Sequence, residues 1–295
     1  MQNNKDNKST EAYINLIIKE RLLLYSKRLI HFFWLVIIMS CASNRFTPRT
    51  ISELVLVDSL VVYQQFDKVS FLPSERTFFC LLQSENSIYI YKNDVFYNKI
   101  GGSGFSSDNF RNLSDITIGI DGYLYALDSF DKSIKRFDRD GKFQNSVSIS
   151  HINSPIKFAF SYFGYIFIYD SHAKEVHSLD SFNFSTKFTF GKFQLYDVDN
   201  LFVCGDFLNI YDNRKKQTNI YLINGKFEND YRDFTYYDTY KNLLSYKNKK
   251  LVDSRNDNLL YESDGYKYIN IENDFLIFFD ENRVNIFKST YKEPR

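Results

Sequence analysis

Four aspartates recur in one sequence context, and a recurring carboxylate can do chemistry. Each ends a short run that begins with an apolar residue, and they are Asp128, Asp170, Asp206 and Asp280. Carboxylates brought together from different segments can surround a hard cation such as Ca²⁺ with oxygen ligands. An aspartate can instead accept hydrogen bonds from the backbone N–H groups of its own turn. Because every turn needs its own aspartate whereas one metal ion needs only a few ligands, the repetition favours turn capping, and we expect no cofactor.

Histidines are the other candidate metal ligands. His172 and His177 lie near Asp170 and Asp180, but their spacing matches no compact helical metal motif, so we expect them and His151 to be surface or loop residues. The sequence contains no Gly-x-Ser-x-Gly elbow, Walker A run or His-Glu-x-x-His motif. These absences disfavour the most common hydrolase and nucleotide-binding classes.

The segment from Phe110 to Phe143 predicts how such residues are positioned. Two Asp-Gly pairs, Asp121-Gly122 and Asp140-Gly141, separate alternating apolar runs. Asp-Gly is a strong hairpin signal because the turn requires positive φ. Four consecutive antiparallel strands of this length form one blade of a β-propeller. Residues 100–149 resemble an NHL repeat, which is the blade type of many six-bladed propellers.

The same apolar run recurs along the chain and predicts the number of blades. Its copies start at residues 78, 123, 165, 201, 243 and 275, with separations of 45, 42, 36, 42 and 32 residues. A four-stranded blade takes about 40 residues, so the spacing predicts an all-β propeller of six four-stranded blades. Not every strand between residues 249 and 272 can be placed, which leaves five blades as an alternative.

Closure of the ring has its own sequence signal. The last repeat ends near Tyr291 without a fourth strand, while the apolar runs 54–57 and 60–63 have no blade of their own. One of these runs is expected to complete the last blade and so remove an exposed sheet edge. Cys80 and Cys204 are assigned to second strands of opposite blades. That separation is too large for a disulfide, so both are expected to be reduced and buried.

The N-terminal forty residues differ from the rest of the chain. Lys27 and Arg28 precede the apolar run 29–39, which has the order of a secretory signal and is short for a bilayer span of about 20 residues. Ile38-Met39-Ser40-Cys41 resembles the bacterial lipobox. The resemblance implies removal of a helical signal segment, residues 1–40, and lipid attachment at Cys41. Residues 41–50 would then be a linker and 51–295 the propeller. An uncleaved signal anchor is the alternative.

Location and partners follow from these features. Lipid attachment would place the protein in a bacterial cell envelope, and without an aspartate after Cys41 we expect the outer membrane, facing the periplasm. The net charge of +1 indicates no nucleic-acid partner. A propeller specifies no chemistry by itself. We therefore predict a non-enzymatic binding or scaffold module for another envelope protein, a peptide or a glycan. The alternative is a calcium-dependent propeller hydrolase or lactonase, a resemblance that implies a cation held by the four aspartates.

Overall fold

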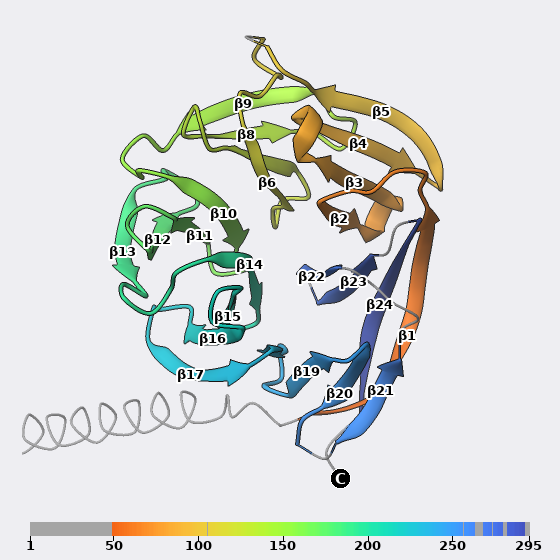
Figure 1. Cartoon of the computed structure of the whole chain (residues 1–295). Coiled ribbons are helices and arrows are strands. Elements are labelled where there is room, and N and C mark those ends of the chain that lie inside the picture. Colours follow the sequence, from red (N-terminus) through yellow and green to blue (C-terminus); the bar gives the residue numbers. More distant parts are fainter. Residues whose placement is uncertain are drawn as a thin grey trace, which may run out of the picture. The chain divides into compact units, whose positions relative to one another are not determined.

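The computed structural model describes residues 49–104, 106–255, 257–262, 268–272, 274–279 and 282–292. In these ranges the chain forms six four-stranded antiparallel sheets arranged as the blades of a propeller ring (Figure 1). Two short 3₁₀ helices, η1 (Pro73–Glu75) and η2 (Gln83–Glu85), are the helical elements of this part of the chain. Within the described ranges no helix is long and apolar enough to cross a membrane. The predicted six-bladed all-β fold is confirmed.

The first three blades follow one another directly along the chain. Blade 1 contains β2 (Lys68–Leu72), β3 (Thr77–Leu82), β4 (Ser87–Lys92) and β5 (Val95–Gly101). Blade 2 contains β6 (Leu113–Ile118), β7 (Leu124–Asp128), β8 (Ser133–Phe137) and β9 (Phe143–Ser148). Blade 3 contains β10 (Pro155–Phe160), β11 (Tyr165–Asp170), β12 (Glu175–Asp180) and β13 (Thr186–Phe190).

The last three blades include the one that joins the two ends of the chain. Blade 4 contains β14 (Val198–Cys204), β15 (Phe207–Asp212), β16 (Gln217–Leu222) and β17 (Phe227–Arg232). Blade 5 contains β18 (Phe234–Tyr237), β19 (Leu243–Lys247), β20 (Lys250–Asp253) and β21 (Asn258–Glu262). Blade 6 contains β22 (Tyr268–Glu272), β23 (Phe275–Phe279), β24 (Arg283–Lys292) and β1 (Thr50–Val61).

The two Asp-Gly pairs of blade 2 form the turns that the sequence predicts. Gly122 has a φ of +74° in the turn between β6 and β7, and Gly141 has a φ of +83° between β8 and β9. Both angles lie in the left-handed region, which glycine enters without steric cost. The turns therefore place the four strands of this blade as expected.

The ring is closed by the N-terminal strand. β1 pairs antiparallel with β24, from Thr50 opposite Lys292 to Val61 opposite Arg283. This pairing supplies the fourth strand that the last repeat lacks, and it covers the edge of β24, which would otherwise be open to association. The predicted closure is confirmed.

Apolar and aromatic side chains fill the spaces between neighbouring blades. Phe79 and Ile88 of blade 1 pack in one buried cluster with Ile116 and Leu124 of blade 2. Phe167 and Tyr169 of blade 3 join a similar cluster with residues of blade 4. Because each β-sheet is buried on both faces in this way, the inner strands of the blades read as continuous apolar runs.

Blade 5 departs from the pattern of the others. Its first strand, β18, packs against β15, β16 and β17 of blade 4, while β14 of blade 4 contacts β22 of blade 6. Five inner strands therefore meet around the axis, namely β2, β6, β10, β14 and β22. The short β20 and β21 lie within residues 249–272, where the sequence pattern does not place every strand.

One repeat assignment is wrong. The apolar run at residues 201–204 belongs to β14, the first strand of blade 4, whereas the second strand is β15. Both strands are buried, apolar and followed by a polar residue, so the sequence pattern does not distinguish them. Cys204 accordingly lies on a first strand, and Cys80 on the second strand β3.

Candidate functional site

Polar side chains from neighbouring inner strands meet at the axis of the ring. Lys68 of β2 and Asp115 of β6 are both buried, and Lys68 Nζ lies 2.8 Å from Asp115 Oδ1. Asp115 also accepts backbone N–H groups of Ile116, at Oδ1, and of Phe158 on β10, at Oδ2. The aspartate thus links three consecutive blades and leaves neither of its oxygens unpaired.

Two asparagines make similar links on the other side of the axis. Asn200 Nδ2 of β14 donates to the carbonyl of Ile269 on β22 at 3.0 Å. Asn270 Nδ2 of β22 donates to the carbonyl of Val69 on β2 at 3.1 Å. Buried polar groups are tolerated when they are hydrogen-bonded in this way, and these side chains join inner strands of different sheets.

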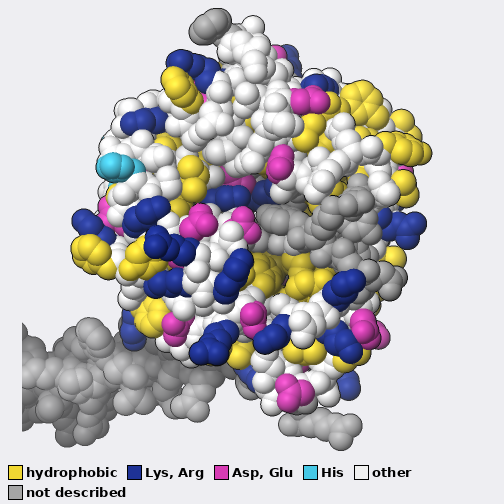
Figure 2. All heavy atoms as spheres, viewed as in Figure 1, with side chains coloured by type: hydrophobic (Ala, Val, Ile, Leu, Met, Phe, Trp, Pro, Cys, Tyr) yellow, Lys and Arg dark blue, Asp and Glu magenta, His cyan; other side chains and the backbone are white. Residues whose placement is uncertain are grey.

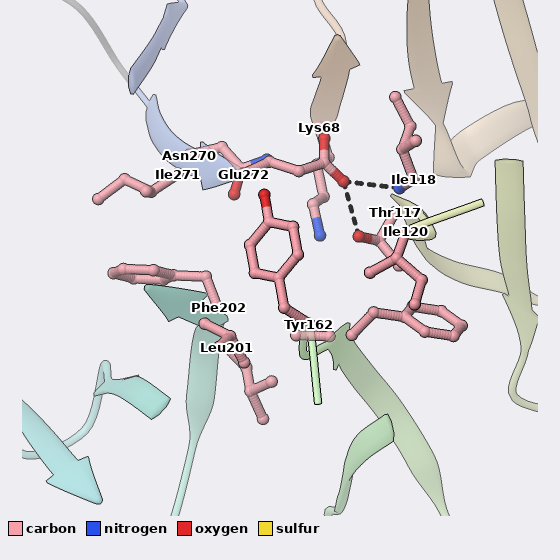
Figure 3. A pocket seen from close by; sticks show the side chains of 13 residues that line it. Lys68, Thr117, Ile118, Ile120, Tyr162, Leu201, Phe202, Asn270, Ile271 and Glu272 are labelled. Carbon is pink, nitrogen blue, oxygen red and sulfur yellow. Dashed lines mark hydrogen bonds between the residues drawn. The ribbon is translucent and has the colours of Figure 1, made fainter. Parts of the chain in front are cut away.

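Glu272, the last residue of β22, differs from these groups. Its Oε1 accepts hydrogen bonds from Thr117 Oγ1 at 2.6 Å and from the backbone N–H of Ile118 at 2.7 Å (Figure 3). Its Oε2 is buried and has no hydrogen-bond partner among the residues that the structure describes. Burial raises the pKa of Glu272, against the smaller opposing effects of Lys68, of the two donors and of the nearby Ser70 hydroxyl. The Ser70 hydroxyl is also buried and forms no hydrogen bond of good geometry among the described residues. An unpaired buried carboxylate oxygen is costly, so it is a feature that requires an explanation.

The unpaired oxygen belongs to a small pocket at the carboxyl ends of the inner strands. The free volume is about 20 Å³, and one water-sized group needs about 10–15 Å³. Lys68, Thr117, Glu272, Ile120 and Tyr162 are among the lining residues, and the last two are 57% and 53% exposed. Figure 3 shows the aromatic ring of Tyr162 between the carboxylate and the ring of Phe202. The pocket is therefore a polar floor with an apolar and aromatic entrance.

Sequence reasoning missed this site. Asn270 and Glu272 alternate with Ile269 and Ile271, so a polar group recurs on one side of a strand whose other side is apolar. A charged residue at the end of such a strand was the available signal. No short sequence motif marks the site, because the residues that surround Glu272 come from four other strands and loops.

The structure places Asp128 and Asp170 as turn caps. Asp128 accepts backbone N–H groups of Arg111, Asn112, Phe130 and Asp131 at 2.8–3.2 Å. Asp170 accepts the corresponding four from Asn153, Ser154, His172 and Ala173 at 2.8–3.2 Å. Each carboxylate thus ties the turn after its own second strand to the segment that enters the blade.

These backbone bonds also govern the ionisation of Asp170. Burial by itself raises the pKa of this carboxyl, but the four N–H donors outweigh burial and hold the pKa below its usual value.

Asp206 does not belong to this series. It follows Gly205 in the tight turn between β14 and β15, at the opposite end of the blade, and its carbonyl accepts the Ile223 N–H at 3.0 Å. The equivalent of Asp128 in blade 4 is Asp212, which ends β15 and accepts three backbone N–H groups, from Tyr196, Arg214 and Lys215. The prediction of Asp206 as a member is wrong for the same reason as the strand assignment. Asp280 lies outside the described residues.

The other predicted residues have the following positions. His151 and His172 are exposed loop residues. His177 lies on β12 with a side chain that is 12% exposed, so the expectation of a surface or loop position is wrong for this residue. Cys80 and Cys204 are buried free thiols, as expected. In the described part of the chain no group of three or more His, Cys, Asp and Glu side chains is placed to hold a metal ion. Cys41 and the predicted signal segment, residues 1–40, lie outside the described residues.

Comparisons with known proteins identify the fold. The chain is similar to the WD40 β-propeller domain of Doa1, with a TM-score of 0.53, 14% sequence identity, and coverage of 78% of this chain and 80% of that one. At this identity the similarity concerns the fold. No protein-family profile and no curated protein sequence matches the chain.

Proposed function

We propose that this chain is a non-enzymatic binding module of a bacterial cell envelope, and that its partner inserts a small cationic group into the axial pocket. The observation that carries the proposal is the unpaired, buried Oε2 of Glu272 at the floor of that pocket. A propeller ring offers a rigid frame of this kind, and pockets with a few convergent polar groups are the usual sites of recognition.

The charges at the floor of the pocket favour a cation. Lys68 and Asp115 form a close pair, so their charges offset each other. Ionised Glu272 then leaves the floor with one negative charge in excess. A primary ammonium group is about the size of a water molecule, can donate to Oε2, and is attracted to an aromatic face such as that of Tyr162. We therefore favour a protein or peptide partner that presents a lysine side chain or an N-terminal amine over a glycan.

The geometry offers little support for the hydrolase alternative. Asp128 and Asp170 are the described members of the aspartate series. Their carboxylate oxygens accept hydrogen bonds from backbone N–H groups in their own blades. Asp206 lies at the other end of its blade. These carboxylates do not form the shared ligand set that a central calcium would need.

Anchoring through Cys41 is part of the proposal and rests on the lipobox resemblance; the NHL-like character of residues 100–149 likewise remains a proposal. Metabolic labelling with a fatty acid tests the anchor directly. We expect the wild-type chain to carry the label and to be processed, and the Cys41→Ala chain to remain as an unlabelled precursor. Equal labelling and equal mobility of the two chains would contradict lipid attachment at this residue.

Binding in the pocket is tested with acetyl-Gly-Lys-Gly-amide as the probe and calorimetry as the measurement. We expect Glu272→Gln to weaken binding about tenfold or more, because loss of a buried charge partner costs about 2 kcal/mol or more. Asp206→Asn is the matched control, because it removes one charge from the same face without touching the pocket. The norleucine analogue, which lacks the ammonium group, should not bind.

Two results would contradict the pocket proposal. Wild-type protein that binds the lysine and norleucine peptides equally would exclude recognition of the ammonium group. Equal affinities of the wild type and Glu272→Gln would exclude the carboxylate. A photocrosslinking residue in place of Tyr162, compared with one at Phe193 on the opposite face, identifies the partner in whole envelopes.

A further inference from the structure

An exposed apolar surface covers the outer strands of blades 6 and 1. We call this surface the apolar rim, and its residues are 41–67% exposed: Val55, Leu56, Val57 and Val61 of β1 with Val95, Phe96 and Tyr97 of β5. Figure 2 shows hydrophobic side chains gathered along the upper right edge, over the place that β5 takes in Figure 1. Monomeric soluble proteins rarely expose large contiguous apolar patches without a function.

The two halves of the apolar rim are held side by side. Arg76 Nη2 lies 2.8 Å from Asp58 Oδ1 on β1 and 3.2 Å from Asp94 Oδ2, in the turn that precedes β5. One guanidinium therefore joins the second half of β1 to the turn before β5. The seven apolar residues thus lie on two outer strands that this ion pair links across the boundary between two blades.

Outer strands elsewhere in the ring have a different composition. β9 exposes Gln144, Asn145 and Ser146, and β17 exposes Asn229 and Asp230. On the described outer strands of blades 2 to 5, the large apolar side chains exposed to a similar extent are Phe227 and Leu259. The apolar character thus belongs to one side of the ring rather than to propeller outer strands in general.

We propose that the apolar rim rests on the lipid surface of the membrane to which the chain is anchored. This inference rests on the proposed lipid attachment at Cys41, which is nine residues before Thr50, the first residue of β1. Nine extended residues span at most about 30 Å, so the anchor would hold this side of the ring close to the bilayer. The strand that the tether reaches first is also the strand that carries most of the apolar rim.

The chemistry of the apolar rim suits a bilayer interface. Aliphatic side chains and the amphipathic ring of Tyr97 lie together, and Lys92 Nζ lies 4.5 Å from the centre of that ring. Aromatic and lysine side chains are favoured at the level of lipid headgroups, where an apolar body meets a polar surface. The bilayer contact would fix the direction in which the axial pocket faces.

The test places a fluorescent probe at single positions of the full-length chain in vesicles of phosphatidylethanolamine and phosphatidylglycerol. Val57→Cys and Phe96→Cys carry an environment-sensitive label in the apolar rim. Phe182→Cys, which replaces a 95% exposed residue of blade 3, is the matched control on the far side of the ring. Cys80 and Cys204 are buried and burial raises the pKa of both thiols, so they react slowly with the label. The Cys41 thiol is blocked in the acylated chain, so the label selects the introduced residues in that form.

We expect nitroxide-labelled lipids to quench the probe at residues 57 and 96 several-fold more than at residue 182. Equal quenching at all three positions, or none at 57 and 96, would overturn the proposal. Energy transfer between labelled copies without lipid quenching would also overturn it, because the apolar rim would then pair two chains. Mass spectrometry of the same sample reports acylation at Cys41, so failure of the anchor is distinguished from failure of the apolar rim.

Discussion

The two ends of the inner strands hold buried carboxylates in opposite situations. At the end where the strands begin, Asp128 and Asp170 each accept four backbone N–H groups from their own blade. At the end where the strands finish, Glu272 accepts two hydrogen bonds through Oε1 and none through Oε2 within the described residues. Burial acts on both kinds of carboxyl, but the pKa of Asp170 is lowered and that of Glu272 is raised.

The difference separates a structural role from a candidate binding role. A carboxylate whose oxygens are all engaged locally has nothing left to offer a ligand, and its removal should damage the fold. A carboxylate with one unpaired buried oxygen destabilises the protein without ligand, and a ligand that donates a hydrogen bond to that oxygen can offset this cost. Residue type and repetition in the sequence point to the first kind, whereas the second kind is visible in the assembled ring.

The largest effect is expected for Asp170→Ala. The substitution leaves four backbone N–H groups of one turn without their acceptor, and we expect a loss of about 3 kcal/mol in the free energy of unfolding. Chemical denaturation of the variant and of wild type measures this difference. A loss below about 1 kcal/mol would show that the carboxylate is not a principal cap of the turn.

The same pair of proteins tests the pKa of Asp170. Because its folded pKa is lowered, its contribution to stability is present above the unfolded value of about 3.9 and is lost as the pH falls through the folded pKa. The stability difference between wild type and Asp170→Ala should therefore shrink in acid. A difference that stays constant down to the acid transition would contradict the assigned shift.

A smaller effect of opposite sign is expected for Glu272→Gln. The raised pKa of Glu272 means that its contribution to stability is present below the unfolded value of about 4.3 and is lost as the pH rises through the folded pKa. The glutamine variant does not ionise, so its stability relative to wild type should increase as the pH rises through that range. Peptide binding to the wild type should tighten over the same range, because the ionised carboxylate is the form that attracts a cation.

The smallest effect is expected for Asp206→Ala. The Asp212 side chain accepts three backbone N–H groups of blade 4. Within the described residues, the Asp206 side chain makes no comparable hydrogen bonds. We expect a change within about 0.5 kcal/mol, as for ordinary surface substitutions. Asp212→Ala provides the comparison, and a larger loss for Asp206→Ala than for Asp212→Ala would restore the original aspartate series.

Several features of this protein are determined by local sequence alone. Asp121-Gly122 and Asp140-Gly141 specify turns because the required positive φ is a property of the residue in the turn. Asp128 and Asp170 cap their turns because their donors are close in sequence or paired across one hairpin. The number of blades follows from a repeat spacing near 40 residues, and the unpaired strand at each end of the chain predicts closure by β1.

Tertiary structure decided the rest. Asp206 and Asp212 both follow buried apolar strands, and only the pairing of β14 with β15 shows which strand is first. The surroundings of Glu272 are formed by Thr117, Lys68 and Tyr162, which are distant in sequence and meet when the ring closes. The apolar rim likewise combines residues of β1 and β5, which belong to different blades and are linked by the ion pairs of Arg76. Periodicity reports which way a strand faces, but the neighbours of a side chain depend on how separate blades are brought together.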